Sequence, residues 1–90
     1  MTSFHQKVLL AAGSSSTGDA TLTKASDWAG LDVDNFFIYN KGTDPLTVTI
    51  NSITTTVEYG TASDEIYKDP ITSVEIASTG TAAYNWGVRL

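Results

Sequence analysis

The residue types that perform catalysis are sparse in this chain, and their spacing completes no catalytic motif. His5 is the single histidine, and no motif pairs it with a serine nucleophile. The glycines at the ends of the segment 13–18 have the spacing of a phosphate-binding loop. However, Asp19 stands where that loop carries a lysine, and its carboxylate would repel a phosphate. The chain has no cysteine, which excludes thiolate nucleophiles and zinc ribbons. We therefore predict a protein that is not an enzyme and binds no cofactor.

Acidic residues suggest two further kinds of chemistry. A pair of carboxyl groups facing each other across a sugar can hydrolyse a glycosidic bond. The candidates for such a pair are Glu58, Asp64, Glu65 and Glu75. We interpret these scattered carboxylates as a solvated surface that blocks edge pairing. A second group could hold a calcium ion through several oxygen ligands or could cap turn amides, and both interpretations stay open for its members, Asp27, Asp32 and Asp34. We predict no metal residue, because the glycine and terminal glutamate of an EF-hand are missing.

Aromatic side chains are candidates for contact with another molecule. Tyr84 and Trp86 share a strand face with Val88, so we predict that they pack in the core. Trp28 and Tyr67 lie in loop-like or edge segments. For each of them we expect either contact with another molecule or packing against the core. The polar lead before the first strand contributes two more candidates. The predicted interaction residues are Phe4, His5, Trp28 and Tyr67.

Length and charge limit the organisation and the partners of the protein. A chain of 90 residues with 41% hydrophobic content forms one domain, residues 1–90, with a short N-terminal arm at about residues 1–7. Ten acidic residues against five basic ones give a net charge of -5, which disfavours nucleic acid and anionic membrane surfaces as partners. No apolar run is long enough to cross a bilayer. The remaining class of partner is another protein or a sugar.

Alternation of apolar and polar residues indicates an all-β fold. Leu46–Ile50 alternates without a fault, and Asn35–Asn40 is apolar on both faces, as a central strand is. We expect Gly13–Gly18 to be a flexible loop and Asp27–Asp34 to be a loop that buries Trp28. Other predicted strands are Val8–Ala12, Asp19–Lys24, Ile66–Tyr67, Ile71–Ala77 and Ala82–Leu90. About six to eight short strands predict a small antiparallel β-sandwich, with a small barrel as the alternative.

The register after Ile50 has two interpretations. A two-residue turn at Asn51-Ser52 would start the next strand at Ile53. A longer loop through Thr55 would start it at Thr56, with Val57 and Tyr59 as its buried pair, and we favour this longer loop. Gly60 to Glu65 is then a polar connection.

The order of these segments resembles small β-sandwich virion proteins of tailed bacteriophages. The residues that carry the resemblance are Val8-Leu9-Leu10-Ala11-Ala12, the loop ending Thr17-Gly18, Phe37-Ile38-Tyr39-Asn40-Lys41-Gly42, Leu46-Thr47-Val48-Thr49-Ile50, Ser73-Val74-Glu75-Ile76-Ala77-Ser78-Thr79-Gly80 and Tyr84-Asn85-Trp86-Gly87-Val88-Arg89. These segments cover most of the chain. Where the commoner pattern has Ser-x-Asp-Gly, this chain has Ser52-Ile53-Thr54-Thr55.

The resemblance implies a structural role in a virion, without a catalytic residue. We expect a capsid decoration or cement protein that binds the major capsid protein or another virion protein. We expect it to be a homo-oligomer or to be repeated on a symmetric shell, and to assemble in the host cytoplasm. The alternative is a carbohydrate-binding or receptor-binding adhesin module of a virion tail or fibre.

Overall fold

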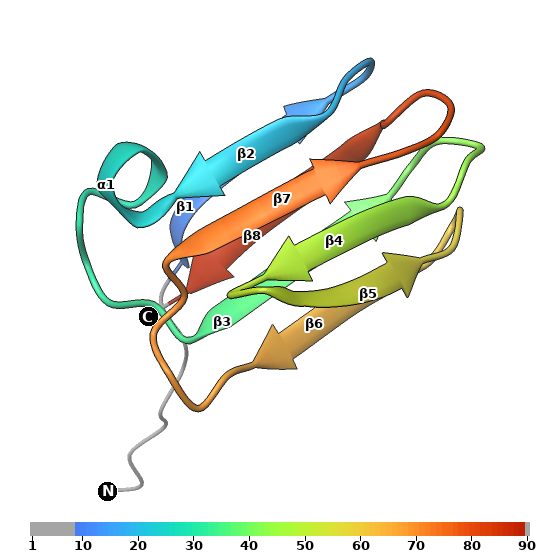
Figure 1. The fold of residues 1–90 in the computed structure, drawn as a ribbon. Coiled ribbons are helices and arrows are strands. Elements are labelled where there is room, and N and C mark those ends of the chain that lie inside the picture. The colour runs from blue at the N-terminus through green and yellow to red at the C-terminus, as the bar shows by residue number, and fades with distance from the viewer. Residues whose placement is uncertain (1–8, 90) are drawn as a thin grey trace, which may run out of the picture.

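The computed structural model describes residues 9–89, which form two four-stranded antiparallel sheets packed face to face (Figure 1). The back sheet has the order β1 (Leu9–Ser15), β8 (Tyr84–Arg89), β3 (Asn35–Asn40) and β6 (Ala62–Ile66). The front sheet has the order β2 (Ala20–Thr23), β7 (Ser73–Ala77), β4 (Leu46–Ile50) and β5 (Ile53–Val57). The prediction of an all-β sandwich is confirmed, and the two sheets do not close into the alternative barrel.

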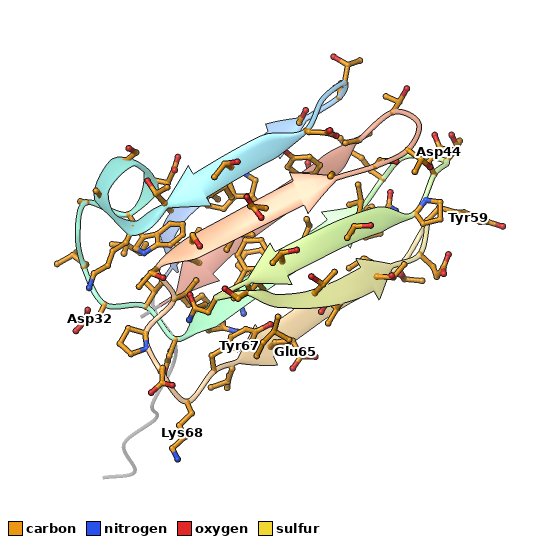
Figure 2. The ribbon with its side chains drawn as sticks, in the orientation of Figure 1. Asp32, Asp44, Tyr59, Glu65, Tyr67 and Lys68 are labelled. Carbon is orange, nitrogen blue, oxygen red and sulfur yellow. The ribbon has the colours of Figure 1, made fainter. Side chains whose placement is uncertain are left out.

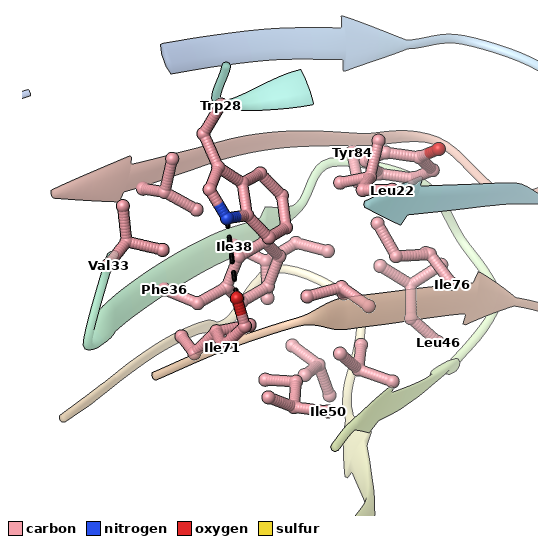
Figure 3. Packing of buried hydrophobic residues seen from close by; sticks show 14 of the residues in the cluster. Leu22, Trp28, Val33, Phe36, Ile38, Leu46, Ile50, Ile71, Ile76 and Tyr84 are labelled. Carbon is pink, nitrogen blue, oxygen red and sulfur yellow. Dashed lines mark hydrogen bonds between the residues drawn. The ribbon is translucent and has the colours of Figure 1, made fainter. Parts of the chain in front are cut away.

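The core lies between the sheets and follows the period of two along each strand. In β4, Leu46, Val48 and Ile50 are buried, whereas Thr47 between them is exposed. Trp28 lies at one end of this core, where its indole Nε1 donates a hydrogen bond to the carbonyl oxygen of Ile71 at 3.3 Å (Figure 3). The prediction that the loop after residue 27 buries Trp28 is confirmed.

A single helical turn, α1 (Lys24–Asp27), connects the two sheets before Trp28. The hydroxyl of Thr23 accepts a hydrogen bond from the Ser26 amide at 3.2 Å, and the Asp27 carboxylate accepts one from the Thr23 amide at 2.7 Å. This reciprocal arrangement satisfies amides that the first turn of a helix leaves free. Positive φ angles at Ala29 and Gly30 then end the turn and direct the chain toward β3.

The predicted long loop after Ile50 is wrong, because β5 begins at Ile53. Asn51 and Ser52 have φ angles of 48° and 71°, so both adopt the left-handed conformation that a two-residue hairpin turn requires. The Asn51 side chain is held from outside the turn, since it accepts a hydrogen bond from the Thr72 amide at 2.9 Å and donates one to the Pro70 carbonyl at 3.0 Å. Val57 is buried as expected, but Tyr59 is 64% exposed.

Two predicted connections belong to strands. The residues 60–65 were expected to be a polar connection, yet Ala62–Ile66 forms β6 and pairs with β3. The glycine-rich loop was expected to begin at Gly13, but β1 continues to Ser15. A Cβ atom at Gly13 would lie 2.7 Å from the Trp86 Nε1, so glycine here makes room for the indole on the neighbouring strand. The polar sequence of both segments reflects their positions at sheet edges.

Candidate functional site

The predicted interaction residues are not brought together on one surface of the described chain. Phe4 and His5 lie outside the described residues. Trp28 is only 1% exposed, so the prediction that it contacts another molecule is wrong and its core alternative holds. Tyr67 is half-buried against the core, and its amide donates a hydrogen bond to the Asp34 carbonyl at 2.7 Å. Burial and the nearby Glu65 charge raise the pKa of the Tyr67 hydroxyl above its ordinary value.

The acidic residues considered for calcium serve local structure. Asp27 caps α1, and Asp32 forms an ion pair with Lys24. Asp34 uses its carbonyl to hold Tyr67. Within residues 9–89, no group of three or more acidic or histidine side chains is arranged to hold a metal ion. The capping interpretation is therefore the one that the geometry supports for Asp27.

The acidic residues considered for glycoside hydrolysis are dispersed over the sandwich. Asp64 and Glu65 are consecutive residues of β6 in the back sheet, so their side chains point to opposite faces. Glu75 lies on β7 in the other sheet, opposite Thr21 and Thr49 and exposed like Thr21. These three carboxylates do not face one another across a common cleft, which removes the geometric basis for two-carboxylate catalysis by them.

A polar network lies on the outer face of the back sheet. The buried Asn35 amide donates hydrogen bonds to the Asp64 carboxylate at 2.7 Å and to the Glu65 carbonyl at 2.8 Å. The Arg89 guanidinium donates to the Asn35 oxygen at 2.8 Å and to Asp64 at 3.0 Å. It also lies 4.1 Å from the centre of the Phe37 ring, a cation–π distance. Each of these polar groups is paired within the chain, so we interpret the network as structural.

Acid should weaken this network through Asp64. The hydrogen bond from Asn35 and the interaction with Arg89 hold the pKa of the Asp64 carboxyl below its ordinary value of 3.8. The ionised carboxylate therefore stabilises the fold above that value, and the contribution is lost as the pH falls through the folded-state pKa. The urea concentration at the unfolding midpoint of the native chain should decrease as the pH is lowered through this acid range. The midpoint of Asp64→Asn should decrease less over the same range. An equal fall in both proteins would contradict the assignment.

Two hollows, each lined in part by Lys68, lie at the end of the sandwich where the loops after α1 and β6 meet. Figure 2 labels Lys68 at this end, with Asp32 and Tyr67. One hollow has a volume of about 270 Å³ and is lined by Asp32, Val33, Asp34, Lys68 and Pro70. The other has a volume of about 200 Å³ and is lined by Asn51, Ile53, Tyr67, Lys68 and Asp69. Both volumes are below the range typical of small-molecule sites. The side chain of Asn51 is already engaged with Pro70 and Thr72, so it braces the loop rather than facing a ligand.

The three most exposed large apolar residues of the described chain lie on a different part of the molecule, which we call the β5–β6 side. It comprises β5, β6 and the loop 58–61, which run along the same long side of the sandwich in the two layers (Figure 1). Among the described residues, three large apolar side chains of this side are exposed by more than half: Ile53 (62%), Tyr59 (64%) and Ile66 (67%). Tyr59 points away from the body of the molecule (Figure 2). Ile53 and Ile66 lie at the opposite end of this side from Tyr59, so the exposed apolar side chains are spread along its length.

The β5–β6 side was not predicted from the sequence. A signal was present in Ile53–Val57, a stretch of high β-propensity without a charged residue, but the incorrect loop placement concealed it. Within residues 9–89 no helix has the length and apolar character needed to cross a membrane. No protein-family model matches the chain, and comparisons with curated proteins and with solved structures give no match. The resemblance to bacteriophage virion proteins therefore stays a prediction.

Proposed function

We propose that the chain is a non-enzymatic structural protein of a bacteriophage virion that decorates or cements the capsid. Its partner in this proposal is the major capsid protein or another virion protein. The observation that carries the proposal is the β5–β6 side, where two unpaired strand edges run side by side and three exposed apolar side chains, Ile53, Tyr59 and Ile66, are spread along their length. A surface of this composition suits adhesion to protein, and the resemblance of the strand order to virion proteins supports the choice of partner.

The magnitude of the apolar contribution limits how such a contact can work. Burying one large apolar side chain contributes about 1.5–3 kcal/mol, whereas association costs about 4–15 kcal/mol in lost freedom. Three such side chains alone therefore give only weak binding. Stable attachment needs further contacts or many copies held on one symmetric shell.

Co-sedimentation with shells assembled without the chain tests this proposal. The native chain should pellet with the shells, and the double variant Tyr59→Ser with Ile66→Ser should lose most of its binding, because both exposed anchors lie on the β5–β6 side. Leu31→Ser is the matched control, since Leu31 is also exposed but lies in the loop after α1. The control should bind like the native chain. Equal binding by all three proteins would contradict the proposal.

The alternative function, a carbohydrate-binding or receptor-binding adhesin, has one favourable observation. Tyr67 lines the smaller hollow together with the charged Lys68 and Asp69, which gives an aromatic ring beside polar groups. Since Trp28 is buried, Tyr67 is the remaining member of the predicted stacking pair. A glycan array with binding that Tyr67→Ala abolishes would favour this alternative. An array without binding would leave the virion structural role as the better account.

A further inference from the structure

β5 is the least protected sheet edge in the described part of the chain. Sheet edges resist unwanted pairing through charge, irregular register or short length. The edge strand β6 carries Asp64 and Glu65, the register of β1 shifts between Leu9 and Ala11, and β2 has only four residues. In contrast, β5 has five residues, Ile-Thr-Thr-Thr-Val, without a charge, a proline or a glycine. This edge is therefore suited to accept another strand.

The backbone groups that β5 offers follow from its tight turn. In a two-residue hairpin the residues that flank the turn exchange the first pair of hydrogen bonds, and bonded pairs alternate along the ladder. Here Ile50 pairs with Ile53 beside the turn. The amide and carbonyl groups of Ile53, Thr55 and Val57 therefore face β4. The same groups of Thr54 and Thr56 face the free edge.

The side chains of β5 form two rows with different chemistry. The register with β4 places Ile53, Thr55 and Val57 on the core-facing side, where an apolar residue stands at each end of the row. The outward row is polar and consists of Thr54 and Thr56, with Glu58 continuing the same parity. A strand that fits this edge has apolar residues at matching alternate positions and a positive charge on its other row.

The N-terminal arm and Val8 have this pattern. Phe4, Gln6 and Val8 alternate with Ser3, His5 and Lys7. No acidic residue precedes Asp19 in the sequence, so this is the part of an otherwise acidic chain that an acidic surface attracts. We propose that the arm of one copy adds to β5 of a second copy as an antiparallel strand, with Val8 opposite Ile53 and Phe4 opposite Val57.

In this register, both the core-facing row and the outward row of side chains on the arm lie beside the corresponding row of β5. Gln6 lies opposite Thr55 in the core-facing row, and the backbone groups of His5 and Lys7 meet those of Thr56 and Thr54 at the free edge. His5 is then the diagonal neighbour of Glu58 on the outward row. The register also places Val8 of the donor copy directly opposite the exposed Ile53 of the acceptor copy, which shields the Ile53 side chain from water.

The pairing has to occur between copies. Val8 is covalently bonded to Leu9, the first residue of β1. β1 and β6 form the two opposite edges of the back sheet, and β5 lies on the β6 side. The width of that sheet, three strand spacings, is about 14 Å, whereas consecutive Cα atoms lie only about 3.8 Å apart. Val8 therefore cannot lie opposite Ile53 of its own copy. A donor edge and an acceptor edge on opposite sides of one chain form a head-to-tail contact, which closes into a ring or continues as a filament.

The experiment measures self-association of the purified full chain by sedimentation equilibrium, without any shell, so its result is independent of the proposed capsid binding. The chain lacking Met1–Lys7 should have a dissociation constant at least about tenfold higher. Thr56→Lys should have the same effect, because it places a charge at the free edge facing the basic arm. Thr47→Lys is the matched control, since Thr47 pairs directly with Thr56 but lies on the interior strand β4, and it should associate like the native chain.

A peptide of residues Met1–Val8 provides a second readout that does not depend on the stability of a variant. Added to the chain lacking Met1–Lys7, it should shift the NMR signals of the Thr54 and Thr56 amides, and a peptide with serine at positions 4 and 8 should not. If the deletion leaves association intact while Thr56→Lys abolishes it, β5 pairs with itself and the proposal is wrong. A full chain that stays monomeric at all concentrations, with no shift from the peptide, also overturns it.

Discussion

Trp28→Ala is expected to remove about 3–5 kcal/mol of stability, because Trp28 is the largest fully buried side chain among the described residues. Trp28 is 1% exposed and packs at the end of the core near Val33 and Phe36 (Figure 3). Its replacement leaves a cavity and removes the hydrogen bond to the Ile71 carbonyl. A chain of 90 residues has a total stability of about 5–14 kcal/mol. We therefore expect the variant to be partly unfolded at ambient temperature or to unfold at much lower urea concentration.

Urea unfolding followed by circular dichroism measures this loss. Leu31→Ala is the control, because Leu31 is exposed in the same loop and its removal should change stability by no more than about 0.5 kcal/mol. A Trp28→Ala protein as stable as this control would show that Trp28 is not part of the core. In that case Trp28 would again be a candidate for contact with another molecule.

Gly87→Ala is expected to cost about 1–3 kcal/mol by overpacking. A Cβ atom at Gly87 would lie 2.1 Å from the Phe37 Cζ, because the ring lies directly over the backbone of β8. The substitution must displace the ring and with it the contact between Phe37 and the Arg89 guanidinium. The network of Arg89 with Asn35 and Asp64 depends on that placement.

A double-mutant cycle identifies the cause of this loss. Phe37→Ala removes the obstructing ring, so adding Gly87→Ala to it should cost much less than the same change in the native chain. Asn85→Ala, an exposed position on the same strand face, serves as the control for a change to alanine in β8 and should be nearly neutral. Additive losses in the cycle would mean that the ring does not determine the need for glycine.

The period of two in the sequence was sufficient to predict the class of fold and the centres of its strands. Strands occur as predicted at Leu46–Ile50 and Asn35–Asn40. Both are interior strands, flanked by a neighbouring strand on each side, so most of their apolar side chains are buried and the pattern is clear in the sequence. The edge strand β6 was predicted only at Ile66–Tyr67, whereas it spans Ala62–Ile66, because an edge strand exposes most of its residues and its sequence therefore resembles a polar connection. The turn at Asn51-Ser52 was the less favoured of two interpretations. Its left-handed conformation is supported by side-chain hydrogen bonds of Asn51 from Thr72 and to Pro70, which join residues far apart in sequence.

The candidate surface could not be predicted because it depends on strand order. β5 and β6 are adjacent in sequence, but they belong to different sheets and lie at the edge of each. Only that arrangement makes Ile53 and Ile66 exposed, whereas the same residue type at Ile50 is buried. For Trp28, sequence reasoning retained both alternatives, and the choice between them required knowing that Val33 and Ile71 pack around the indole.

Hydrogen exchange of the chain bound to assembled shells, compared with the free chain, most directly tests the claim that this protein works by adhesion through the β5–β6 side. We predict that the amides of Tyr59 and Ile66 become protected on binding, while amides along the opposite edge strand β2 exchange as before. Protection confined to the β2 edge, or no change in exchange at Tyr59 and Ile66, would contradict the claim.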